Sequence, residues 1–83
     1  MTQDRPITVI DARGLNCPLP VLRLRKRLQS LPAGAAVELL ATDRAALRDV
    51  PAFCEAQGHV IVAAEESDNV LRFTVIKGAL PKV

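Results

Sequence analysis

The sequence predicts an α+β fold, a two-layer α/β sandwich whose elements follow the order β-α-β-α-β-β. Short runs of β-branched residues alternate with two longer segments in which apolar residues recur every three or four positions, and Gly or Pro stands between them. The last two strand patterns are separated only by the residues SDN, which predicts a hairpin. Because strand-helix-strand crossovers are right-handed, both helices should cover one face of a mixed four-stranded sheet.

The strands and the first helix are marked by composition and periodicity. Runs of β-branched residues bounded by turn residues predict strands at residues 7–11, 36–41, 59–66 and 70–77. The segment from Pro18 to Leu31 predicts an amphipathic helix, because its apolar residues are spaced by three, four and three positions. These residues are Val21, Leu24, Leu28 and Leu31. Pro32 and Gly34 then end the helix.

The second helix has a clear end and a less regular start. Thr42 or Asp43 is expected to cap its beginning, and Gly58 should close it. One apolar stripe is predicted to hold Leu47, Val50 and Cys54. Pro51 predicts either an irregular first turn or a restart of the helix capped by Asp49.

Length and composition limit the functions open to the chain. The 83 residues are expected to form one domain, 1–83, because a division would leave neither part with a core. There is no Trp or Tyr and there are only two Phe, so no aromatic row can stack nucleobases and no direct nucleic-acid binding is expected. No apolar run reaches the length of a membrane span, and no secretory signal pattern precedes the first strand. A cytoplasmic protein is therefore expected.

Cysteine usage and charge direct attention to the N-terminal third. Cys17 and Cys54 are too few for a disulfide framework, and no spacing of Cys or His predicts zinc, so neither a metal nor a cofactor is expected. Residues 1–32 carry six basic and two acidic side chains, whereas residues 33–83 carry five basic and seven acidic ones. The positive field around Cys17 could attract an acidic partner surface or a phosphate backbone.

The segment GLNCPLP, residues 14–20, places Cys17 directly before the first helix. If Cys17 is the N-cap, Pro18 and Pro20 occupy first-turn positions that have no hydrogen-bond partner within the helix, and they stiffen the turn. Cysteine is a poor N-cap, so stability does not explain its position. A thiolate there would face the positive end of the helix dipole near Arg13, with a pKa below the value of about 8.5 for free cysteine. Cys17 is therefore predicted to be a nucleophile at neutral pH; the alternative, a small buried hydrophobe, would not need the two prolines.

Two other features each have a functional and a structural interpretation. Leu19 and Leu22 should point away from the apolar stripe of the first helix, beside Arg25 and Lys26. They form either a docking surface for an acidic-rimmed protein or an ordinary solvated face. Cys54 is predicted to be a core residue, and the alternative is a resolving cysteine for Cys17.

At DARGLNCPLP, residues 11–20, the sequence resembles the TusA family, also called SirA-like proteins, whose signature is a CPxP motif at the start of the first helix. The resemblance continues through RDVPAFCEAQGH, residues 48–59, and covers residues 7–78. It includes an upstream Asp-x-Arg-Gly and a downstream Asp-x-Pro followed by Gly-His. The resemblance implies the same two-layer sandwich.

The resemblance also implies a sulfur carrier. Cys17 would take sulfane sulfur as a persulfide from a cysteine desulfurase or a rhodanese-type donor and pass it to an acceptor protein, acting with these enzymes rather than alone. The motif would be supported by Arg13, Gly14, Pro18 and Pro20. The partner-docking region would correspond to Leu19, Leu22, Arg25 and Lys26. Because Leu19 stands where the tRNA-thiolation branch commonly has an acidic residue, tRNA thiolation, molybdenum-cofactor maturation and sulfur oxidation all stay open.

Two other classes of function compete with the carrier. A thiol redox or regulatory switch would use Cys17 with Cys54 and requires the two sulfurs to reach disulfide geometry. A non-catalytic RNA- or protein-binding module would use the basic first helix. Its binding would be steeply salt-dependent and would not depend on Cys17.

Overall fold

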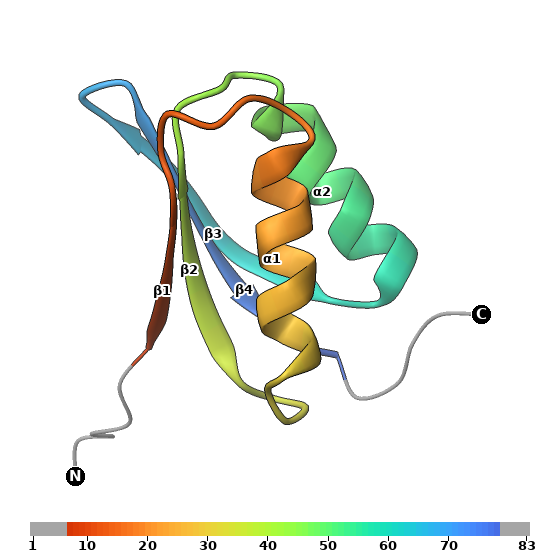
Figure 1. Cartoon of the computed structure of the whole chain (residues 1–83). Helices are drawn as coiled ribbons and strands as arrows, with labels where there is room; N and C mark the ends of the chain where they lie inside the picture. Colours follow the sequence, from red (N-terminus) through yellow and green to blue (C-terminus); the bar gives the residue numbers. More distant parts are fainter. Residues whose placement is uncertain (1–6, 79–83) are drawn as a thin grey trace, which may run out of the picture.

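The computed structural model of the chain describes residues 7–78 (Figure 1). Its elements follow the predicted order and are β1 (Thr8–Ala12), α1 (Leu19–Gln29), β2 (Ala36–Ala41), α2 (Ala46–Gln57), β3 (Val60–Ser67) and β4 (Val70–Ile76). β2 has the predicted bounds, β1 and β3 each lie one residue further along the chain than predicted, and β4 ends one residue earlier. Both helices begin later than predicted. Neither helix of the described part is long and apolar enough to cross a membrane.

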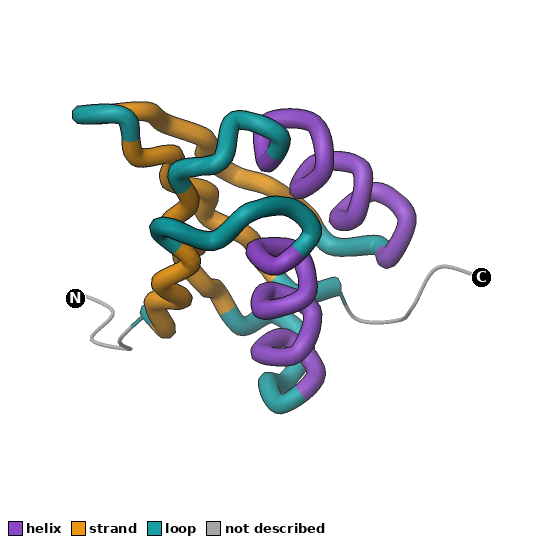
Figure 2. Tube along the Cα trace, turned by 45° about the horizontal axis from the view of Figure 1, so that its top comes forward, coloured by secondary structure: helices purple, strands orange, loops and turns teal. Residues whose placement is uncertain are grey.

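The four strands form one mixed sheet in the order β1-β2-β4-β3. β1 and β2 are parallel, as a crossover through α1 requires, and β4 is antiparallel to both β2 and β3. A shift of register between Ile61 and Ala63 marks a β-bulge in β3. Figure 2 shows both helices on the same face of the sheet, which confirms the predicted two-layer sandwich.

The core lies between that face of the sheet and the helices. Side chains alternate between the two faces of a strand, so every second residue of the two central strands is buried. The buried residues of these strands are Val37, Leu39 and Ala41 in β2 and Leu71, Phe73 and Val75 in β4. The predicted stripe of α1 is confirmed, because Leu24 and Leu28 are buried while Val21 and Leu31 are half-buried and pack against the core.

The second helix departs from two predictions. Leu47 is 46% exposed, because the stripe that faces the core is set by Ala46, Val50 and Cys54, spaced four residues apart. The predicted cap at Thr42 or Asp43 is also wrong, because the N-cap is Ala45 and no side chain caps the helix. Of the two alternatives predicted for Pro51, the restart at Asp49 is not observed, because the helix runs through Pro51. The irregular first turn is confirmed: the backbone N–H groups of residues 46, 47 and 48 bond to carbonyls three residues earlier instead of four.

Candidate functional site

Cys17 lies in the loop between β1 and α1. Because β1 and β2 are parallel, the loops that follow them leave the same end of the sheet, seen at the top of Figure 1. The loop from β2 to α2 therefore lies beside the loop that carries Cys17. The topology thus brings Asp43 and Asp49, 26 and 32 residues away in sequence, to the cysteine.

Two hydrogen bonds join these loops. Gly14 N–H donates to Thr42 Oγ1 at 2.9 Å, and Cys17 N–H donates to Asp43 Oδ2 at 2.7 Å. Asp43 Oδ1 also accepts the N–H of Ala45 at 3.0 Å. These backbone bonds from Ala45 and Cys17 lower the pKa of Asp43, because they favour its ionised form. The φ of Gly14 is +80°, a left-handed conformation that favours glycine at this turn.

The Cys17 thiol is exposed and donates a hydrogen bond to Asp49 Oδ2. Asp49 comes from α2, and its other oxygen accepts Arg48 Nε at 3.1 Å. The hydrogen bond to Asp49, partial desolvation and the negative charges of Asp49 and Asp43 together raise the pKa of Cys17. The same hydrogen bond, with that of Arg48, lowers the pKa of Asp49. At rest the proton therefore belongs to the sulfur.

The lowered pKa predicted for Cys17 is therefore wrong. Arg13 forms a bidentate pair with Asp11, with both N–O distances 2.9 Å, and makes no hydrogen bond to the sulfur. The thiol does not cap α1 either. The helix begins at Leu19 with Pro18 as its N-cap, and the Leu19 N–H bonds to the Asn16 carbonyl at 2.9 Å. The hydrogen bond to Asp49, desolvation and the two carboxylates raise the pKa of Cys17, although the positive charge of Arg48 acts in the opposite direction.

The proline positions differ from those expected. The N-cap is Pro18 instead of Cys17, and Pro20 is the second residue of α1 instead of the third. Pro20 is buried and Pro18 exposed, and the Cys17–Pro18 peptide bond is cis. Both prolines still occupy positions whose missing N–H costs the helix no hydrogen bond.

The residues predicted for partner docking lie on the outside of α1. Leu19 and Leu22 are 46% and 47% exposed, and Arg25 and Lys26 are exposed further along the same helix. Leu19 is two residues from Cys17, so an apolar surface adjoins the thiol, and positive charge lies one to two helical turns away. This placement agrees with the geometry expected from the sequence.

Cys54 is buried against the core, and burial raises its pKa to about 11. Such a thiol reacts slowly, and both cysteines are free. These observations support the interpretation of Cys54 as a core residue. Within residues 7–78, no group of three or more His, Cys, Asp or Glu side chains is arranged to hold a metal ion.

Asp43 and Asp49 were not among the site residues predicted from the sequence. The available signal was the segment RDVP at residues 48–51, whose Asp49 was interpreted only as part of a family marker and as the cap of a restarted helix. Its Asp49 is the residue that holds the thiol. Asp43 was considered only as a helix cap, and it instead joins the Cys17 backbone to the turn before α2.

Replacing Asp43 with alanine should loosen the Cys17 loop. The Cys17 amide loses its acceptor, so its hydrogen–deuterium exchange, followed by NMR, should become several-fold faster. Asp43→Asn is the matched control, because asparagine keeps an acceptor oxygen and should retain most of the protection. Equal exchange in wild type and Asp43→Ala would contradict this role.

Comparison with known proteins identifies the family of the chain. Residues 8–77 match the family model described as Sulfurtransferase TusA. A protein named sulfur carrier protein TusA from Pseudomonas putida strain GB-1 is 38% identical over 79 residues, 95% of this chain and 99% of that protein, and one from strain W619 is 37% identical over 79 residues with the same coverage. The crystal structure of a SirA-like protein from Desulfitobacterium hafniense is similar, with a TM-score of 0.78 and 31% identity, covering 87% of this chain and 99% of that one. The chain therefore belongs to the sulfurtransferase TusA family.

Proposed function

We propose that this chain is a sulfur carrier that holds sulfane sulfur as a persulfide on Cys17. The observation that carries the proposal is an exposed thiol on a loop fastened to its neighbour by two hydrogen bonds. Exposure lets the active sites of two different proteins reach the same sulfur in turn. The names of the relatives, sulfur carrier proteins, support the same function.

Loading is a sulfur exchange without net oxidation. The Cys17 sulfur, on losing its proton, attacks the terminal sulfur of a persulfide on the donor protein. A new S–S bond forms to Cys17 Sγ, the S–S bond of the donor breaks, and the donor cysteine leaves as a thiolate. The proton that Cys17 held against Asp49 ends on that thiolate, so charge and atoms balance. In delivery, an acceptor thiolate attacks the terminal sulfur of the Cys17 persulfide, the S–S bond to Cys17 Sγ breaks, and Cys17 leaves as a thiolate.

Asp43 and Asp49 interact differently with the thiol of the unloaded carrier and with the persulfide of the loaded carrier. A protonated thiol donates a hydrogen bond to Asp49, which holds the sulfur in place. A persulfide is more acidic than its parent thiol, so after loading the terminal sulfur carries negative charge near two negative side chains. Repulsion by Asp43 and Asp49 then favours positions in which the terminal sulfur points away from the carboxylates and towards solvent and an acceptor.

The partners follow from the same chemistry. The donor is a cysteine desulfurase or a rhodanese-type enzyme, and the acceptor is a second sulfur-accepting protein, in the cytoplasm. Docking uses Leu19, Leu22, Arg25 and Lys26, which adjoin the thiol on α1. The pathway served is tRNA thiolation, molybdenum-cofactor maturation or sulfur oxidation. A redox switch with Cys54 is disfavoured by the burial of that residue.

Intact-mass spectrometry tests the proposal. Wild-type protein incubated with a cysteine desulfurase and cysteine, or with a rhodanese and thiosulfate, should gain one sulfur atom that a reductant removes. Cys17→Ser should lose this gain completely, and Cys54→Ser, the control that also lacks one thiol, should retain it. Sulfur loading in Cys17→Ser, or a wild type that is alkylated readily yet never loads, would contradict the proposal.

A further inference from the structure

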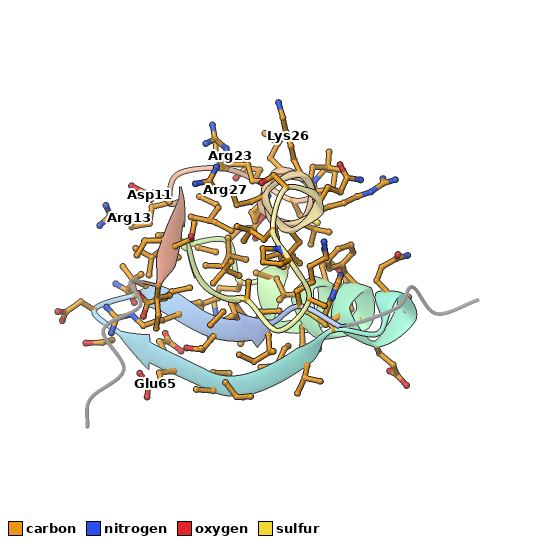
Figure 3. The ribbon with its side chains drawn as sticks, turned by 90° about the horizontal axis from the view of Figure 1, so that it is seen from below. Asp11, Arg13, Arg23, Lys26, Arg27 and Glu65 are labelled. Carbon is orange, nitrogen blue, oxygen red and sulfur yellow. The ribbon has the colours of Figure 1, made fainter. Side chains whose placement is uncertain are left out.

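A groove of about 690 Å³ lies between α1 and the outer side of β1. Its walls include Val9 and Asp11 from β1, Arg23, Lys26 and Arg27 from α1, and Ser30 just after that helix. Figure 3 shows Arg23, Lys26 and Arg27 at the α1 side of this groove and Asp11, beside Arg13, at the β1 side. The groove is distinct from the Leu19 and Leu22 surface, although Lys26 borders both.

The groove carries excess positive charge. Arg23, Lys26 and Arg27 are exposed, and none of them forms a salt bridge within residues 7–78. Asp11, the acidic residue of the groove, is already paired with Arg13 at 2.9 Å. The three cations are therefore available to carboxylates or phosphates from another molecule.

The other wall is a free sheet edge. Within the described residues 7–78, β1 pairs only with β2, in continuous register from Thr8 to Ala12, and no bulge interrupts that ladder. Its outer side therefore offers backbone hydrogen-bonding groups to an added strand. Val9 is 55% exposed and Ile7, just before β1, is 51% exposed, so apolar side chains are available beside this edge.

These features favour a protein segment over a nucleic acid. Stacking of bases needs exposed aromatic side chains, and of the two Phe residues Phe73 is buried and Phe53 half-buried. A strand edge with apolar neighbours suits an extended peptide, and the cations suit acidic side chains on it.

We propose that the groove binds an acidic, extended segment of the sulfur donor protein, which adds to the free edge of β1 while its carboxylates contact Arg23, Lys26 and Arg27. This inference rests on the proposed function for the identity of the partner. β1 ends at Ala12, five residues before Cys17, so a segment bound along β1 leads towards the thiol. Strand addition would thereby orient the partner's reactive sulfur relative to Cys17.

A peptide of alternating Glu and Val, about ten residues long and fluorescently labelled, is the probe. Fluorescence anisotropy should show salt-dependent binding to the full chain. Arg23→Gln combined with Arg27→Gln should weaken it roughly tenfold. The control, Ala56→Glu with Gln57→Glu, makes the same change in net charge at exposed sites of α2 and should bind as wild type does. Bound peptide should also slow hydrogen exchange of β1 amides.

Several results would overturn the inference. These are no peptide binding, equal weakening in both double variants, binding without protection of β1, or binding of a single-stranded RNA in place of the peptide. Self-association through the groove, detected by sedimentation, would also overturn it. The opposite edge strand, β3, carries the exposed Glu65 (Figure 3), so a second copy of the chain is the alternative occupant.

The proposal for the groove and the proposed carrier function can be refuted independently of each other. Inorganic polysulfide needs no docking surface, so it should load Cys17 equally in wild type and in the Arg23/Arg27 variant. A wild type that does not load from polysulfide or from any protein donor refutes the carrier function, whatever the peptide result. Normal loading without peptide binding refutes only the groove.

Discussion

Replacing Asp49 with asparagine should make Cys17 react faster with an alkylating reagent at pH 7. The Asp49 carboxylate accepts the thiol hydrogen bond and is the main cause of the raised pKa of Cys17. Asparagine has nearly the same shape but no charge, so the thiolate is no longer opposed by that carboxylate and the pKa falls. More thiolate is then present at neutral pH, and we expect a several-fold higher rate of reaction with iodoacetamide.

The pH dependence separates this explanation from its alternative. The alkylation profile of Asp49→Asn should shift to lower pH, whereas Glu65→Gln, which removes a carboxylate from exposed β3, should leave it unchanged. If Asp49 instead acts mainly as a base that removes the thiol proton during attack, Asp49→Asn will react more slowly than wild type. That outcome would contradict the role of Asp49 as a group that keeps the thiol protonated.

Replacing Phe73 with alanine should have the largest effect on stability. Phe73 is 2% exposed, lies in the central strand β4 and is among the largest buried side chains. Its loss leaves a cavity that closely packed neighbours cannot fill, which costs about 3–5 kcal/mol. A chain of this size has a free energy of unfolding of only about 4–12 kcal/mol, so the variant should unfold at much lower urea concentration.

An exposed hydrophobic residue provides the control for that experiment. Val62 is 57% exposed on β3, and Val62→Ala should change the free energy of unfolding by no more than about 0.5 kcal/mol. Urea denaturation followed by circular dichroism measures both variants. A loss below about 1 kcal/mol for Phe73→Ala would show that β4 does not hold the core together.

Local patterns were sufficient to predict the fold. The spacing of Val21, Leu24, Leu28 and Leu31 identifies the inner face of α1, because helical periodicity depends only on neighbours in sequence. The same holds for strand alternation, which predicted β2 with its observed bounds. Leu47 was misplaced because it fits the spacing of Val50 and Cys54, while small Ala46 sets the contact with the core. Sequence spacing alone does not show which of two adjacent stripes of a helix faces the core.

The environment of Cys17 could not be predicted from its neighbours. The predicted low pKa of Cys17 rested on the nearby helix dipole and on Arg13, which both favour a thiolate. The groups that decide the protonation state are Asp43 and Asp49, which only the crossover from β1 to β2 brings to the thiol. Charges near in space but far in sequence can reverse the direction of a pKa shift, as they do here.

The place of β4 in the sheet has a consequence for synthesis of the chain on the ribosome. Of the strands in residues 7–78, β4 is made after the other three, yet it lies between β2 and β3 and joins them. Until residues 70–76 leave the exit tunnel, both strands have an unpaired edge and their apolar side chains lack the central strand. Folding of the sheet therefore waits for this long-range pairing, and a ribosome that stalls before residue 70 would hold a chain prone to aggregation.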